Sequence, residues 1–142
     1  MRIHKSCRVR LDGRLWIFGS GGLFGFGVVG KGLYDVLHTT PTLQASIKKI
    51  VIKNADKKRS IAAENFTTDA SLILNDENIN VVVELIDDAD AAFEIVKTAL
   101  QKGKSVVSAN KKMIAEHFEE LLQYCSRVSL ACDAGISRMI IV

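Results

Sequence analysis

The amino-acid sequence predicts an α/β protein with a doubly wound, mostly parallel sheet of about five to six strands and helices on both faces. Short apolar runs rich in Val and Ile alternate with amphipathic helical stretches from residue 23 onward. A glycine-rich turn follows the first run, and 48% of the residues are hydrophobic against 25% charged, as in folded globular chains. The length of 142 residues corresponds to about one domain. We therefore expect one domain over residues 23–142, after a basic, glycine-rich leader over residues 1–22.

The expected strands are short and contain many β-branched residues, as buried parallel strands do. They are Leu23–Phe24 with some residues before it, Ile47–Lys53, Val81–Ile86, Ser105–Ser108 and Val128–Cys132. Consecutive parallel strands need a crossover connection, so we expect helices between them.

The helical stretches have recognisable ends. The first, Val28 to His38, must stop before Pro41, and a short helix follows at Ala70 to Leu74. The clearest signals belong to Ala89 to Lys102, where Asp87 or Asp88 can cap the N-terminus and Gly103 can supply the left-handed stop. The last helix is expected from Lys111 to Tyr124.

The basic start of the chain requires a test for targeting signals. Basic residues precede an apolar stretch from Leu15 to Gly30, which resembles the start of a secretory signal. Six glycines in that stretch disfavour a helix, no A-x-A-like cleavage site follows, and the stretch is shorter than a membrane span of about 20 residues. We therefore expect a cytoplasmic protein without a membrane partner, with an organellar transit peptide as the alternative.

Charge and cysteine content exclude several classes of function. The net charge of +3 is too small to indicate nucleic-acid binding. The three cysteines are an odd number and form no C-x-x-C pair, so we expect neither a disulfide framework nor a metal site. Free thiols in a reducing cytosol are the simplest interpretation.

A G-x-G-x-x-G motif indicates a dinucleotide-binding, Rossmann-like fold, because it follows an apolar run and opens a helix. Its members are Gly25, Phe26, Gly27, Val28, Val29 and Gly30. We expect Gly25 to allow the tight turn, Gly27 to let a pyrophosphate approach the backbone, and Gly30 to allow close packing of helix on strand. A plain flexible loop is the alternative. The other register, starting at Gly19, is rejected because Phe24 would occupy the third glycine position.

The end of the second strand bears on the choice between NAD and NADP. An acidic residue that selects NAD should lie about 20 residues past the motif, on the ribose 2′-hydroxyl. Lys53 occupies that place, and Lys57 and Arg59 follow nearby, where a 2′-phosphate would suit them. NADP is therefore favoured over NAD, although Asp56 could still reach a ribose, and the alternative of a solvated charged turn stays open.

The chain after the strand Ser105–Ser108 lies where open α/β sheets bind ligands. Lys111 could donate to a carbonyl oxygen that becomes negative during hydride transfer, while a solvated helix start is the alternative. Glu84 is unusual inside an apolar strand, and it either points into the crevice or pairs with a lysine. His38 and His117 have no identifiable partners, and we assign them no chemistry.

Three segments of the sequence resemble homoserine dehydrogenase, specifically its N-terminal NAD(P)-binding domain. They are Leu23–Gly32, Val81–Ile86 and Gly103–Lys111, of which the last has the family's small-Ala-Asn-Lys turn. The likeness extends over about Leu23 to Leu122. It implies an oxidoreductase that interconverts aspartate semialdehyde and homoserine with NADPH or NADH, in threonine and methionine biosynthesis. It argues against another Rossmann oxidoreductase that acts on a small aldehyde.

The resemblance also implies roles for particular residues. The backbone from Phe26 to Val29 would bind the pyrophosphate, and Lys111 would be the catalytic lysine beside the nicotinamide and substrate. A basic residue beside the adenosine ribose has varied effects on NADP binding within the family, so the preference stays open. The full set of expected cofactor-binding residues is Gly25, Phe26, Gly27, Val28, Val29, Gly30, Lys53, Lys57, Arg59, Leu85, Ile86, Asp87, Ser108, Asn110 and Lys111.

The sequence departs from the family at both ends. Ser20-Gly21-Gly22 interrupts the expected first strand, and the catalytic and dimerisation region that follows in the family is absent. We therefore expect dinucleotide binding but little catalysis by this chain alone, with a substrate bound only if the missing domain is supplied. A shifted reading frame would produce such ends. The alternative function is a stand-alone nucleotide-binding or sensing domain without catalysis. The oligomeric state does not follow from the sequence.

Overall fold

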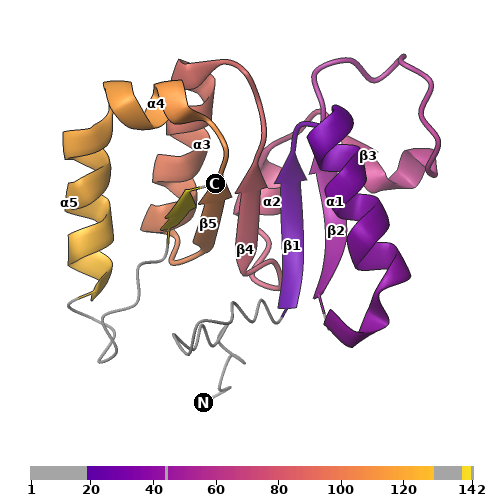
Figure 1. Ribbon diagram of the computed structural model, residues 1–142, viewed down its shortest axis with the longest axis horizontal. Helices are drawn as coiled ribbons and strands as arrows, with labels where there is room; N and C mark the ends of the chain where they lie inside the picture. The colour runs from indigo at the N-terminus through magenta and orange to yellow at the C-terminus, as the bar shows by residue number, and fades with distance from the viewer. Residues whose placement is uncertain (1–18, 44, 130–138, 142) are drawn as a thin grey trace.

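The protein forms a six-stranded sheet in which every neighbouring pair of strands is parallel, and the strand order is β3-β2-β1-β4-β5-β6. The computed structural model describes residues 19–43, 45–129 and 139–141 (Figure 1). The strands are β1 (Gly19–Phe24), β2 (Ala45–Val51), β3 (Phe66–Thr67), β4 (Val81–Glu84), β5 (Ser105–Ser108) and β6 (Met139–Ile141). This is the strand order of doubly wound dinucleotide-binding folds, so the predicted fold class is confirmed.

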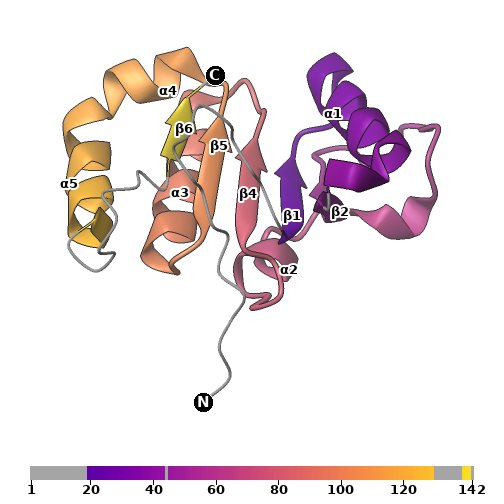
Figure 2. The same cartoon turned by 60° about the horizontal axis from the view of Figure 1, so that its bottom comes forward.

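Helices cover both faces of the sheet, as expected. They are α1 (Val28–Thr39), α2 (Ser71–Leu74), α3 (Ala89–Gln101), α4 (Lys111–Glu116) and α5 (Phe118–Ser129), with short 3-10 turns at Pro41–Leu43 and Ala63–Asn65. Both views show α1 beside β1 and β2, and α3, α4 and α5 at the opposite end of the sheet, around β4 to β6 (Figures 1 and 2). None of the helices among the described residues is both long and apolar enough to cross a membrane.

Side chains along each strand alternate between the two faces of the sheet, so the hydrophobic core consists of two clusters, one on each face. Leu23 of β1 packs in a cluster with α1, whereas its neighbour Phe24 packs in a second cluster with α2, α3 and α4. In the same way Val83 of β4 points to the α1 face and Val82 to the α3 face. Successive side chains of a strand point to opposite faces, so strands buried on both sides must be apolar throughout.

The first strand begins at Gly19, so the expectation that Ser20–Gly22 interrupt it is wrong. These residues pair with β2 on one side and with β4 on the other, with a register shift between Gly21 and Gly22. A Cβ on Gly22 would lie 2.3 Å from Cγ2 of Ile73, which is too close for any side chain. Glycine is therefore required here because Ile73 of α2 packs directly on the backbone of a central strand.

The helix expected from Lys111 to Tyr124 is two helices, α4 and α5, separated at His117. His117 leaves the helical conformation (φ −119°, ψ 20°), and its ring stacks on Phe93 of α3 with the ring centres 3.9 Å apart. This contact lies between residues distant in sequence, so helical periodicity did not reveal the break. The change of direction places α5 against α3, where Lys97 pairs with Glu120 (Nζ to Oε1, 3.5 Å).

The strand expected at Val128–Cys132 is also wrong in its first part. Val128 and Ser129 form the end of α5, and residues 130–132 lie outside the described residues. The position beside β5 is occupied by Met139–Ile141 instead. Both segments are short and largely apolar, and such a composition does not decide which of them reaches the sheet edge.

Two glycines of α1 provide a matched test of the packing between helix and strand. A Cβ on Gly30 would lie 2.6 Å from the carbonyl oxygen of Gly25, whereas a Cβ on Gly32 would meet no atom of the described residues within 4 Å. We expect Gly30→Ala to destabilise the protein by about 1–3 kcal/mol, because backbone must move. Gly32→Ala should stabilise it by about 0.5–1 kcal/mol, because alanine favours the helix. Urea unfolding measures both, and equal effects would contradict the close contact at Gly30.

Candidate functional site

The loops that follow β1, β4 and β5 meet at one edge of the sheet, where the carboxyl ends of the parallel strands lie (Figure 1). Backbone hydrogen bonds join them: Gly25 N–H donates to Val51 (3.0 Å), Leu85 N–H to Phe24 (2.9 Å) and Ala109 N–H to Glu84 (3.3 Å). The chain leaves β1 toward β2 on one side, and β4 lies on the other side, so this is the point where the strand order reverses. Open α/β sheets bind ligands at such a point.

The glycine loop begins with a turn that only glycine allows. Gly25 has φ = 94°, a left-handed conformation, and a Cβ there would lie 2.8 Å from the carbonyl oxygen of Leu85. Gly30, one turn into α1, lies equally close to the backbone of Gly25. These two contacts hold the start of α1 against both β1 and the loop after β4.

Among the described residues, no side chain caps the N-terminus of α1. Gly27 is the N-cap residue, and no described atom lies within 4 Å of the place where its Cβ would be. Val28 and Val29 follow with 92% and 66% of their surface exposed. The N–H groups of the first turn and the positive end of the dipole therefore face an unobstructed approach, as pyrophosphate binding requires.

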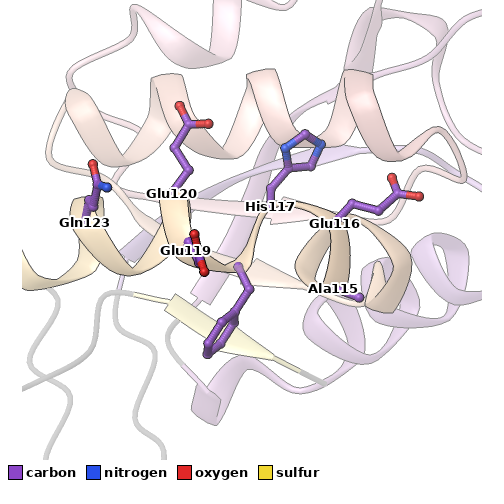
Figure 3. A pocket seen from close by; sticks show the side chains of 7 residues that line it. Ala115, Glu116, His117, Glu119, Glu120 and Gln123 are labelled. Carbon is purple, nitrogen blue, oxygen red and sulfur yellow. The ribbon is translucent and has the colours of Figure 1, made fainter.

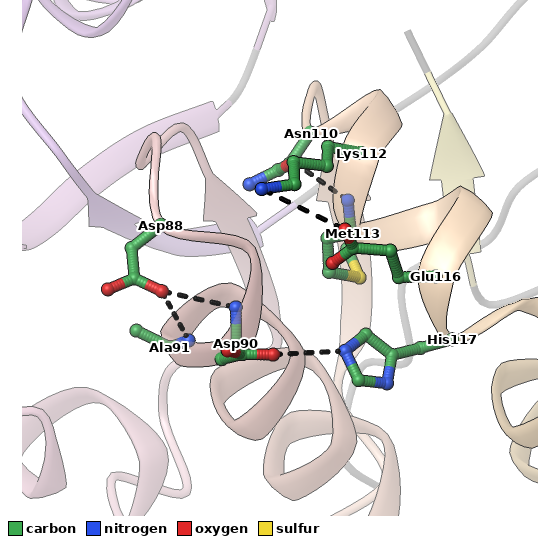
Figure 4. Close-up of polar contacts among 8 residues, drawn as sticks. All are labelled: Asp88, Asp90, Ala91, Asn110, Lys112, Met113, Glu116 and His117. Carbon is green, nitrogen blue, oxygen red and sulfur yellow. Dashed lines mark hydrogen bonds and ion pairs between the residues drawn. The ribbon is translucent and has the colours of Figure 1, made fainter.

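The loop after β4 contains the expected site residues Leu85, Ile86 and Asp87. The next residue, Asp88, is the N-cap of α3. Asp88 caps α3, with Oδ1 accepting from Asp90 N–H (3.1 Å) and Ala91 N–H (3.0 Å), as Figure 4 shows. The hydrogen bond from Ala91 lowers the pKa of the Asp88 carboxyl, and the charges of Lys53 and Lys112 act in the same direction. Leu85 and Ile86 are half-buried at the base of this loop, and Asp87 is exposed.

Glu84 is buried at the end of β4 and does neither of the things expected of it. Its Oε1 accepts from Ile86 N–H (2.7 Å) and its Oε2 from Ser108 Oγ (2.6 Å), at the adjacent end of β5. Burial raises the pKa of this carboxyl, while the hydrogen bonds from Ser108 and Ile86 oppose that shift. The carboxylate therefore joins the two strands instead of facing the crevice or a lysine.

Asn110 continues this connection into α4. Its side-chain amide donates to the carbonyl oxygen of Ile86 (3.0 Å), and its Oδ1 accepts from Met113 N–H (2.9 Å) as the N-cap of α4. Its own N–H donates to Ser108 Oγ (3.2 Å). Lys111 is the first residue of α4 and is exposed. The network of Glu84, Ser108 and Asn110 thus fixes the backbone from which Lys111 projects.

In the basic segment after β2, Arg59 contacts other parts of the protein. Arg59 donates from Nη1 to the carbonyl oxygen of Lys57 (2.8 Å), and its guanidinium lies 5.1 Å from the ring centre of Phe66. Lys53 and Lys57 are exposed. The charge of Lys53 is one of the causes that lower the pKa of the Asp88 carboxyl, after the hydrogen bond from Ala91.

An aromatic cluster beside the glycine loop was not recognised in the sequence. The Phe26 ring meets Phe66 edge-on at 5.1 Å and Tyr34 at 6.2 Å. It thereby links the loop to β3, and through Phe66 to Arg59. No local pattern indicates this cluster, because Phe66 lies in a two-residue strand that the sequence analysis did not predict.

Strand order, glycine loop and crevice together define a Rossmann-type dinucleotide-binding domain. The family model for the NAD-binding domain of homoserine dehydrogenase matches residues 25–129. The chain therefore belongs to the homoserine dehydrogenase family, as its NAD-binding domain, for which a nicotinamide dinucleotide is the cofactor.

Similar proteins agree with this assignment in sequence and in structure. The homoserine dehydrogenase of Helicobacter pylori is 30% identical over 122 residues, and that of Methylobacillus glycogenes is 37% identical over 103 residues. These matches cover 81% and 66% of this chain but only 29% and 25% of the relatives. The solved Staphylococcus aureus homoserine dehydrogenase superimposes with a TM-score of 0.71 and 26% identity, over 88% of this chain and 32% of the other. This chain thus spans about a quarter to a third of their length.

Replacing Glu84 with Gln tests the pH dependence that its burial creates. A carboxyl whose pKa is raised by folding holds its proton more tightly in the native state, so stability falls as the pH rises from about 4 through the raised value. Glutamine stays neutral, and its amide can accept from Ile86 and donate to Ser108 Oγ. We expect Glu84→Gln to gain stability relative to the wild type as the pH rises, measured by urea unfolding.

The exposed Glu64 provides the control for this measurement. Glu64→Gln removes the same charge from an exposed position away from β4, so it reports how much of the trend comes from the loss of charge alone. A stability difference for Glu84→Gln that stays constant with pH would contradict the argument.

Proposed function

We propose that this chain is the cofactor-binding part of a homoserine dehydrogenase that uses NADP in preference to NAD and interconverts aspartate semialdehyde and homoserine. The observation that supports it best is the uncapped N-terminus of α1, open at Gly27 and located where the strand order reverses. We also place the protein in the cytoplasm, since its three cysteines lack the paired spacing typical of an oxidising compartment.

The pyrophosphate binds to the backbone N–H groups from Phe26 to Val29. Gly27 allows this approach because none of the described side chains occupies the space within 4 Å of its missing Cβ. Gly25 and Gly30 contribute by shape, since each makes a backbone contact that a Cβ would prevent. The helix dipole of α1 adds to the attraction for the anion.

The loops after β4 and β5 would hold the nicotinamide half of the cofactor. Leu85, Ile86 and Asp87 would line one side, and the buried Ser108 and Asn110 would hold the other. A bound nicotinamide would supply hydride chemistry at the carbonyl carbon of the substrate. Lys111 donates from its ammonium to the carbonyl oxygen, which becomes negative during that transfer.

The preference for NADP rests on the charges after β2. The place at which a carboxylate would bind the ribose 2′-hydroxyl is occupied by Lys53. Arg59 is held over Phe66, which in turn contacts Phe26 of the glycine loop, so its guanidinium is pre-oriented beside the cofactor site. A planar guanidinium suits a phosphate, and Lys57 adds further positive charge.

Two variants distinguish general binding from recognition of the 2′-phosphate. We expect calorimetric titration of the wild type to show tighter binding of NADPH than of NADH. Arg59→Ala should weaken NADPH binding about ten- to a hundred-fold and leave NADH binding unchanged, because a charged hydrogen bond is lost. Gly27→Val should weaken both cofactors, since its side chain fills the approach to the helix. Equal binding of the two cofactors would refute the NADP preference, and binding of neither would refute the proposal.

The role of Lys111 requires the remainder of the enzyme. When the chain is joined to the catalytic region of a homoserine dehydrogenase, we expect hydride transfer, followed by NADPH absorbance. Lys111→Ala should lower kcat about 10²- to 10³-fold, as the loss of an electrostatic donor does. The neighbouring Lys112→Ala should retain activity, because Lys112 points to Glu116 (3.8 Å). Cofactor binding without any transfer by the joined protein would instead favour a sensing domain.

A further inference from the structure

Three possible metal ligands meet where α4 ends and α3 begins. They are Asp90 in the first turn of α3, Glu116 at the end of α4, and His117 at the junction of α4 with α5. One ligand atom of each residue lies within 4.8 Å of those of the other two. Figure 4 shows the His117 ring facing Asp90, while the preceding residue, Glu116, extends toward Lys112.

The imidazole of His117 is held in place by packing. Its ring lies parallel to that of Phe93, with an angle of 7° between the planes. Phe93 is buried and is three residues after Asp90, so both project from the same face of α3. The backbone of His117 makes two hydrogen bonds. Its N–H donates to the carbonyl oxygen of Met113 (3.0 Å), and its carbonyl oxygen accepts from Leu121 N–H (2.9 Å). Only 23% of the side chain is exposed.

The Nε2 atom of His117 is buried and has no hydrogen-bond partner among the described residues. Its nearest carboxylate oxygen, Oδ1 of Asp90, is 3.5 Å away. That distance is longer than the roughly 2.7–3.2 Å of an N–H···O hydrogen bond. It is close to the roughly 3.4 Å that separates two ligands of a tetrahedral zinc ion with bonds of about 2.0–2.1 Å.

The surroundings of this cluster favour a cation. In the described part of the chain, Glu116 is paired with Lys112 at 3.8 Å between exposed groups, and such a pair is readily exchanged. An adjoining pocket is lined by Glu119 and Glu120 together with Glu116 and His117 (Figure 3). Lys97, the cation on the facing side of α3, is already paired with Glu120.

We propose that Asp90, Glu116 and His117 bind a divalent transition-metal ion, for which Zn²⁺ is the best match. One imidazole nitrogen and two carboxylate oxygens are ligands that zinc accepts, and the 90% exposure of Asp90 leaves a fourth position open to water. The ion connects the start of α3 to the junction of α4 and α5. The site is independent of the proposed cofactor binding.

Titration of the whole chain with ZnCl₂ tests this site. The thiols of Cys7, Cys125 and Cys132 are first blocked with iodoacetamide, because thiolates also bind zinc. We expect calorimetry to show one bound Zn²⁺, with the affinity lowered at least about tenfold in His117→Gln and in Asp90→Asn. Glu119→Gln is the matched control, since it removes the same charge from the neighbouring pocket and should bind as the wild type does.

A second measurement does not depend on any variant. In protein labelled with ¹⁵N at its three histidines, zinc should shift the ring signals of His117 and not those of His4 or His38. The proposal is overturned if zinc does not bind, if the shifts appear at the other histidines, or if Asp90→Asn binds as tightly as the wild type. It is also overturned if Glu119→Gln loses affinity as much as Asp90→Asn does.

Discussion

The structure depends on a close backbone contact at the start of α1. Gly30 approaches the carbonyl oxygen of Gly25, and Gly25 approaches that of Leu85, so closely that a Cβ at either glycine would clash. These contacts place the first turn of α1 at the joined ends of β1 and β4. The same contacts fix the position of the first turn, so the packing of the fold and the proposed binding of a pyrophosphate there have one physical cause.

A buried carboxylate joins the ends of β4 and β5, as the glycine contacts join α1 to β1 and to the loop after β4. A carboxyl at full burial destabilises a fold unless it is hydrogen-bonded, and Glu84 accepts from both Ile86 and Ser108. Asn110 extends the network to the start of α4. The result is a hydrogen-bonded base for Lys111 at the ends of β4 and β5. The proposed zinc site lies at the other end of α4, where His117 stacks on Phe93 of α3.

Most elements of the fold could be predicted because their signals are local. The β5 strand, the Asp88 cap and the Gly103 stop of α3 agree with the structure, since periodicity and capping act over a few residues. The errors have a different origin. The glycines of β1 were misjudged because the room for Ile73 is visible only in three dimensions, and the break at His117 results from stacking on Phe93. The edge strand was misplaced because two similar apolar segments compete for it.

The sequence by itself determined the α/β class, the glycine motif and its position before a helix, the position of Lys111 at the start of the helix after β5, and the family. It could do so because each of these features depends on residues that are close together in the sequence. The tertiary structure decided which groups meet across the chain: Glu84 with Ser108, Arg59 with Phe66, and His117 with Asp90. Such pairings depend on how strands and helices are ordered in space, and no local periodicity encodes that order.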